Sequence, residues 1–106
     1  MGQIKGNMTR EVRRLLNSPT PQIVVTSAVQ AKSAALACYE ILLKVDQDTY
    51  IREDTDAALT ATPVSSANGH FVPQGSSWPL IVDPGNKIGA ITVTAGAGNM
   101  YISAVA

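Results

Sequence analysis

The feature that most constrains the fold is a change of sequence period at Gln22. From there on, short β-branched or alternating runs recur at a spacing of roughly ten residues, as in residues 23–26, 39–45 and 87–94, with turn-forming residues between them. Side chains on a strand point to alternate faces, so such runs suit sheets with one buried side. The pattern predicts an all-β domain over residues 22–106, an antiparallel β-sandwich of about seven or eight short strands.

Three turn signals indicate where these strands end. Residues 46–48 place two aspartates around a glutamine, which predicts a tight turn followed by a returning strand at 49–52. In residues 83–86 a proline followed by a glycine fits the central positions of a type II turn. Residues 95–99 are rich in glycine, and we interpret them as a hairpin connection to a last strand at 100–105.

Two segments are ambiguous. Residues 28–38 are rich in alanine, so a helix is an alternative there. We favour a loop that runs into the strand at 39–45, because apolar residues occupy every second position of that strand. Residues 53–69 are polar and small, which indicates a long surface loop with one weak strand around residues 59–62.

Alternation within the expected strands also predicts the core. Apolar residues that share one face of a strand should lie between the sheets. Replacing one of them, for example Ile91, by alanine should cost roughly 2–5 kcal/mol if it is buried. The predicted core residues are Val25, Tyr39, Ile41, Leu43, Ile51, Leu80, Val82, Ile88, Ile91, Val93, Tyr101 and Ile102.

Residues 1–21 are interpreted as an N-terminal arm ahead of the domain 22–106. A short helix is predicted over residues 9–16, because its three apolar residues fall on one face. The proline-rich linker 17–21 then ends the helix, since the residue before a proline is driven out of the α region. Two helical turns are marginal alone, so this apolar face needs a surface to pack on.

The net charge of zero hides an asymmetry between arm and body. Residues 1–17 hold four basic residues and one acidic residue, a charge of +3, while the rest of the chain holds four basic and seven acidic residues, a charge of −3. A basic arm can dock on the acidic body of a neighbouring copy or on another acidic surface. We predict that the arm binds a partner subunit, with arginines at the rim and apolar residues in a groove: Arg10, Val12, Arg13, Arg14, Leu15 and Leu16.

The composition narrows the classes of partner and of cross-link that the chain can have. Only 15% of the residues are charged, against about 25% in typical proteins, which suggests buried contact with protein partners. Cys38 is the single cysteine, so no disulfide within the chain and no thiolate cluster is expected. There is no run of about 18 apolar residues and no secretion signal, so no membrane partner is expected. Outside the arm the chain is acidic and its aromatics are not interleaved with Lys or Arg, so no nucleic acid is expected either.

Candidate catalytic and metal-binding residues are sparse. His70 is the single histidine, and the serine pairs at 65–66 and 76–77 lie outside any nucleophile-elbow motif. The acidic residues between 46 and 56 are the best metal candidate, but they lack the bend-forming glycine of a calcium loop. We therefore expect no enzyme activity, no cofactor and no catalytic or metal-binding residues, with Asp46, Asp48, Glu53, Asp54 and Asp56 as a solvated acidic rim.

Three short motifs recur in a recognisable order along the chain: Tyr50-Ile51-Arg52, Pro84-Gly85-Asn86-Lys87-Ile88 and Tyr101-Ile102-Ser103. They lie within the segments 23–26, 39–52, 71–75, 82–91 and 98–103. In this order the segments resemble small proteins encoded among the head genes of tailed bacteriophages, of the capsid decoration (cement) type. The resemblance covers roughly residues 22–106. The arm and residues 53–69 fall outside it.

The resemblance implies a jelly-roll-like sandwich and a non-enzymatic role in the virion. Such a protein is made in the host cytoplasm and sits on the phage head, where its partners are the major capsid protein and copies of itself, as a homotrimer. Two alternatives remain open. One is a head–tail connector or tail component with the same fold. The other is a carbohydrate-binding β-sandwich module in which the loops around residues 68–78, with Trp78, hold a sugar.

Overall fold

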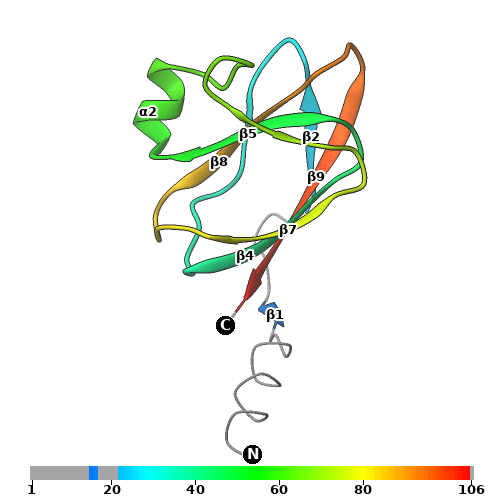
Figure 1. Cartoon of the computed structure of the whole chain (residues 1–106). Coiled ribbons are helices and arrows are strands. Elements are labelled where there is room, and N and C mark those ends of the chain that lie inside the picture. The colour runs from blue at the N-terminus through cyan, green and yellow to red at the C-terminus, as the bar shows by residue number, and fades with distance from the viewer. Residues whose placement is uncertain (1–14, 17–21, 106) are drawn as a thin grey trace, which may run out of the picture.

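The computed structural model describes residues 15–16 and 22–105, with side chains described from Gln22 onward. Its strands form two antiparallel sheets, and one short helix lies beside them (Figure 1). The prediction of an all-β, sandwich-like domain is confirmed for the described residues.

Each sheet combines strands that are distant in sequence. Sheet A is five-stranded and sheet B is four-stranded. Sheet A has the order β1-β9-β4-β7, with β2 also paired to β9, and its strands are β1 (Leu15–Leu16), β2 (Gln22–Thr26), β4 (Glu40–Val45), β7 (Ser77–Ile81) and β9 (Ala97–Val105). Sheet B has the order β3-β8-β5-β6, and its strands are β3 (Ala31–Lys32), β5 (Thr49–Asp54), β6 (His70–Val72) and β8 (Lys87–Thr92).

The strands from β2 onward pair as nested antiparallel partners. β2 pairs with β9, β3 with β8, β4 with β7 and β5 with β6. The pairings of β4 with β9 and of β5 with β8 then join these ribbons into the two sheets. Consecutive strands therefore often lie in different sheets. The segments 46–48 and 93–96 carry the chain from one sheet to the other. The prediction of a hairpin at 95–99 is therefore wrong, because β8 and β9 lie in different sheets and β9 already begins at Ala97.

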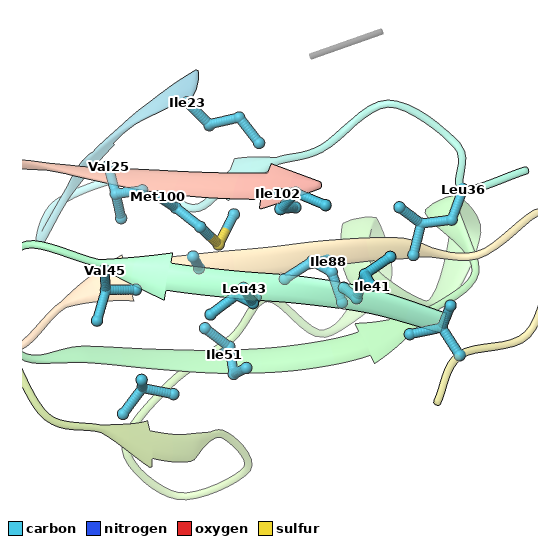
Figure 2. Close-up of a cluster of buried hydrophobic side chains, with 13 residues drawn as sticks. Ile23, Val25, Leu36, Ile41, Leu43, Val45, Ile51, Ile88, Met100 and Ile102 are labelled. Atoms are coloured by element: carbon cyan, nitrogen blue, oxygen red, sulfur yellow. The ribbon is translucent and has the colours of Figure 1, made fainter. Parts of the chain in front are cut away.

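One apolar core lies between the sheets (Figure 2). On β4 the inward positions Ile41, Leu43 and Val45 are fully buried, while Lys44 on the other face is exposed. The buried cluster takes residues from both sheets and from one loop: Ile23, Val25, Leu36, Ile41, Leu43, Val45, Ile51, Val72, Val82, Ile88, Ala90, Met100 and Ile102.

Most of the predicted core residues are buried, and the errors have two causes. Tyr39 (73% exposed), Val93 (41%) and Tyr101 (37%) are exposed. Tyr39 precedes β4 and Val93 follows β8, so neither is held by the alternation of a strand. Tyr101 lies between buried Met100 and Ile102, and adjacent strand residues point to opposite faces. The remaining residues of that prediction are buried, except Ile91 and Leu80, which are half-buried.

The turn predicted at residues 83–86 is confirmed. Gly85 has φ +94°, the left-handed value that the third position of a type II turn requires, and the Asn86 N–H donates to the Asp83 carbonyl at 3.1 Å. The loop favoured for residues 28–38 is also confirmed, because only the two-residue strand β3 interrupts it.

The weak strand expected around residues 59–62 is wrong. Residues Asp56–Ala61 form the helix α2. Thr55 is its N-cap and accepts a hydrogen bond from the Ala58 N–H through its side chain, and Asp56 places a negative charge in the first turn. This capping chemistry, rather than apolar periodicity, marks where the helix begins.

Most of the predicted arm lies outside the described residues, and so does its helix up to Arg14. The two arm residues whose backbone is described, Leu15 and Leu16, form β1 instead of the last helical turn expected there. They pair with Val105 and Ala104 at the end of β9. β1 therefore shares with β2 the edge of β9 that β4 does not occupy.

Candidate interaction surface

Part of the outer face of sheet B is covered by the chain itself. Helix α2 lies beside β5 and β8 (Figure 1), and Leu59 of the helix and Val64 of the segment 63–69 are buried. A Cβ atom on Gly89 of β8 would lie only 2.9 Å from Val64 Cγ2 and 2.5 Å from Gln30 Oε1. Glycine at this position therefore lets the covering segment approach the sheet closely.

Polar contacts fasten this cover to the sheet. The Gln30 side chain donates to the Leu59 carbonyl at 3.0 Å and accepts from the Val64 N–H at 2.9 Å. Lys32 and Lys87 both pair with Asp56, at 2.7 and 3.1 Å. The ammonium groups of Lys32 and Lys87 donate hydrogen bonds to the Asp56 carboxylate and lower its pKa, with the larger effect from Lys32. Arg52 donates to the Thr62 carbonyl at 2.8 Å, so three of the four basic residues of the body serve to hold α2 and the segment after it.

The outer face of sheet A has no such cover among the described residues. Its outward positions carry several apolar side chains that water reaches, above all Ile81 (86% exposed) and Val24 (61%). Cross-strand pairing places Pro79 beside Leu42, and Tyr101 beside Lys44. Among the described side chains, Glu40 and Lys44 are the only charged ones at outward positions of these strands. We call this surface the open face and define it by Val24, Leu42, Pro79, Ile81 and Tyr101.

Sequence reasoning missed the open face, although a signal for it was present. Each strand of sheet A whose side chains are described holds adjacent apolar residues: Val24-Val25, Leu42-Leu43, Leu80-Ile81 and Met100-Tyr101. Since neighbouring strand residues point to opposite sides, one member of each pair must face outward. A β-sandwich strand with apolar residues on both faces indicates that its outer face has a partner or a cover.

A cleft of about 340 Å³ lies on the side of the sandwich where β7 and β6 are the edge strands. Its polar groups are mostly engaged: Glu53 Oε2 accepts from the Asp83 N–H at 2.7 Å and from Asn86 Nδ2 at 3.0 Å. His70 is exposed at the cleft, and Trp78 is half-buried against the core. The lining is mainly aliphatic, and comprises Ile51, Arg52, Glu53, His70, Trp78, Leu80, Ile81, Val82 and Ile88.

The acidic residues considered as metal ligands do not converge. Asp48 accepts from the Gln74 N–H at 2.8 Å, and Asp54 pairs with Arg52 at 3.3 Å. Asp46 accepts from the N–H and the side-chain amide of Asn99, and these hydrogen bonds lower its pKa. Over residues 22–105 no three His, Cys, Asp or Glu side chains lie close enough together to hold a metal ion.

The predicted arm site cannot be placed as a whole. Arg10, Val12, Arg13 and Arg14 lie outside the described residues, and of Leu15 and Leu16 the backbone alone is described, in β1. β1 lies at the Ala104–Val105 end of β9, so the arm joins the domain at one end of sheet A.

Comparisons with protein-family models, with curated proteins and with solved structures found no match. In the part of the chain that the structure describes, no helix has the length and apolar content needed to cross a membrane. The resemblance to phage decoration proteins therefore depends on the sequence motifs given above.

Proposed function

We propose that the chain is a non-enzymatic structural protein of a tailed-phage virion, a decoration protein that binds the assembled head and stabilises it. The open face of sheet A is the observation that carries this proposal. Large exposed apolar surfaces on small domains mark sites of contact with other proteins. Here the outer face of sheet B is partly covered by α2 and the segment 63–69, and the outer face of sheet A presents Val24, Ile81 and Tyr101 to the surroundings.

The strand order supports a jelly-roll-like assignment, which is the finer fold that the resemblance implies. Nested pairing of β2 with β9, β3 with β8, β4 with β7 and β5 with β6 is what a long antiparallel ribbon gives when it is wound into two sheets. Jelly rolls are common in viral capsid domains. This order therefore fits a virion role, although the same fold also serves other functions.

A decoration protein needs little chemistry beyond such surfaces. A module that binds neighbouring assembled subunits better than free ones adds its binding free energy to the assembled state. Repetition around a shell supplies avidity without strong single contacts. In this proposal the open face lies on the major capsid protein, and the basic arm reaches an acidic surface of a neighbouring subunit or of another copy of the chain.

The experiment is a binding assay on shells that lack the chain, assembled from the major capsid protein encoded in the same genome. Ile81→Lys places a charge on the open face at a position that is already solvent-exposed and lies opposite Glu40 on β4, so folding should be unaffected. Val93→Lys, at an exposed loop position after β8 of sheet B, is the matched control. We expect Ile81→Lys to lower occupancy at least several-fold and Val93→Lys to leave it unchanged. Equal binding of both variants would contradict the proposal.

A carbohydrate-binding module is the second candidate, favoured by one observation. His70 of β6 and Trp78 of β7, both within the residues 68–78 expected to hold a sugar, lie at the same cleft. Trp78 fluorescence during titration with a glycan panel tests it directly, because Trp78 is the single tryptophan. A saturable change would favour the sugar-binding function over the virion function. A connector or tail component with the same fold is distinguished by its copy number in the particle.

A further inference from the structure

The free edges of the two sheets differ in how far they resist pairing with another chain. An exposed edge strand offers unpaired N–H and C=O groups, and soluble proteins usually shorten such edges or interrupt them. In sheet B the edge strands β3 and β6 have two and three residues. In sheet A the edge strands are β7 on one side and β1 with β2 on the other.

The edge strand β7 contains a proline, Pro79. The Val45 N–H donates to the Ser76 carbonyl and the Val82 N–H donates to the Tyr39 carbonyl, which sets the alternation of hydrogen bonds between β4 and β7. By that alternation the main chain of Pro79 faces the free edge. The missing N–H of proline therefore costs the sheet nothing and removes a donor from the edge.

β2 has no comparable protection. It is five residues long, and its sequence Gln22-Ile23-Val24-Val25-Thr26 holds neither a charged residue nor a proline. Four of its five residues are β-branched, the residue type that strands favour. This edge therefore meets the description of a template for pairing with a further strand.

Hydrogen-bond alternation identifies which main-chain groups β2 offers. The Asp46 N–H donates to the Asn99 carbonyl at 3.2 Å, so the odd-numbered residues of β9 face β4 and the even-numbered ones face β2. Gly98 and Met100 pair with Val25 and Ile23. The N–H and C=O groups of the alternate residues Gln22, Val24 and Thr26 therefore point to the free edge, and no described residue bonds to those of Val24.

We propose that two copies of this chain pair through β2, antiparallel, with the two-fold axis at Val24. The strand is self-complementary in this register. Val24 of one copy faces Val24 of the second copy, and Gln22 faces Thr26, so each facing pair exchanges both of its main-chain hydrogen bonds. On the open side of sheet A the exposed Val24 side chains then meet each other, and Gln22 meets Thr26 without opposing charges.

Such a pair is an isologous dimer in which sheet A continues from one copy into the next. It differs from the trimer that the resemblance implies, and the mass of the oligomer decides between them. The pairing uses the edge of β2 and not the whole open face. The proposed dimer therefore does not depend on the virion role. If the chain is a monomer that still binds shells, the dimer proposal is wrong and the virion proposal stands.

The test measures the mass of the full chain in solution by sedimentation or light scattering over a range of concentrations. We expect a concentration-dependent dimer. Val24→Lys places two ammonium groups opposite each other at the two-fold axis and should give a monomer, whereas the neutral β-branched variant Val24→Thr should still dimerise. Ile81→Lys, an exposed position on the far edge strand β7, is the matched control and should remain dimeric.

Val24→Pro gives an independent readout. It removes an N–H that faces the free edge and not β9, as Pro79 does on β7, so it should also yield a folded monomer. If Val24→Pro fails to fold, the masses of Val24→Lys and Ile81→Lys in solution decide whether the dimer forms through β2. A monomeric wild-type chain at all concentrations, a trimer, or a dimer that survives Val24→Lys would overturn the proposal.

Discussion

Asp46 and Asn99 are joined by three hydrogen bonds across the sandwich edge where β4 ends and β9 begins. The Asp46 carboxylate accepts from the Asn99 N–H at 2.7 Å and from its side-chain amide at 2.9 Å, and the Asp46 N–H donates to the Asn99 carbonyl at 3.2 Å. Gln22 donates to Asn99 Oδ1 at 3.1 Å. One asparagine thus links three strands of sheet A at the point where the chain crosses between sheets.

We expect Asp46→Asn to destabilise the fold by about 1–2 kcal/mol, the scale of hydrogen bonds lost to a charged acceptor. An amide at position 46 can accept one of the two Asn99 donors, but its own N–H₂ then faces the other. Urea denaturation at neutral pH measures the loss. Asp83→Asn is the control, because the Asp83 carboxylate has no hydrogen-bond donor among the described residues.

The same pair predicts a pH dependence. Hydrogen bonds from Asn99 hold the pKa of Asp46 below its ordinary value of 3.8. The folded state therefore binds this proton less readily than the unfolded state does, so the stabilisation is complete above about pH 5 and is lost as pH falls through the lowered pKa. Between pH 5 and pH 3 the wild-type chain should lose more stability than Asp46→Asn. An equal loss in both proteins would show that Asp46 does not contribute.

Ile88 and Ile91 lie three residues apart on β8 and should respond differently to truncation. Ile88 is fully buried between the sheets, whereas Ile91 points to the other face and is half-buried. Ile88→Ala should cost roughly 2–5 kcal/mol and Ile91→Ala roughly 1 kcal/mol or less. Chemical denaturation of both variants checks the assignment of faces. Similar losses, or a larger loss at Ile91, would contradict it.

The alternation of apolar residues predicted only part of the fold. Alternation at Ile41, Leu43 and Ile51 predicted buried positions correctly, because each lies within a strand whose two faces differ. It failed where apolar residues are consecutive, as at Met100, Tyr101 and Ile102, since a run that is apolar on both faces does not reveal which face is buried. It also could not assign strands to sheets. Pairing of β2 with β9 is set by contacts over more than seventy residues of chain, as in the Gln22–Asn99 hydrogen bond with a separation of 77.

Helix α2 was missed for a physical reason. α2 contains one buried residue, Leu59, and therefore has no apolar periodicity to detect. Its position depends on tertiary hydrogen bonds from Gln30 and Arg52, which no local pattern encodes. Only its N-cap, Thr55, was visible in the sequence. Because the cover on sheet B was not foreseen, the contrast with the uncovered face of sheet A was not foreseen either.

Gln30→Ala should loosen the cover without unfolding the sheets. Its loss leaves the buried carbonyl of Leu59 and the N–H of Val64 without their partner, at a cost of about 1–3 kcal/mol. Hydrogen exchange should quicken in residues 56–69 and stay slow in β4. Gln74→Ala, an exposed glutamine whose side chain makes no hydrogen bond to any described residue, is the control. Unchanged exchange in residues 56–69 would contradict the role of Gln30.

The arm prediction is best tested by deleting residues 1–14, which keeps β1. The domain should stay folded, because the described sheets contain none of these residues. Shell binding should weaken sharply, since the deletion removes the basic residues and Val12. Replacing Arg10, Arg13 and Arg14 by alanine should weaken binding at low salt and matter less at high salt, because exposed charges are screened. If the truncated chain still binds shells at full occupancy, the sandwich domain and not the arm makes the contacts with the shell.

The most direct measurement of the virion assignment is the amount of this chain in purified particles relative to the major capsid protein. Quantitative mass spectrometry of virions from the phage whose genome encodes the chain gives that ratio. A decoration protein that repeats over the shell should be present in a number comparable to the capsid subunits or capsomers. Absence from the particle would contradict the account, and a ratio as small as a single ring of subunits would replace the decoration role with a connector or tail role.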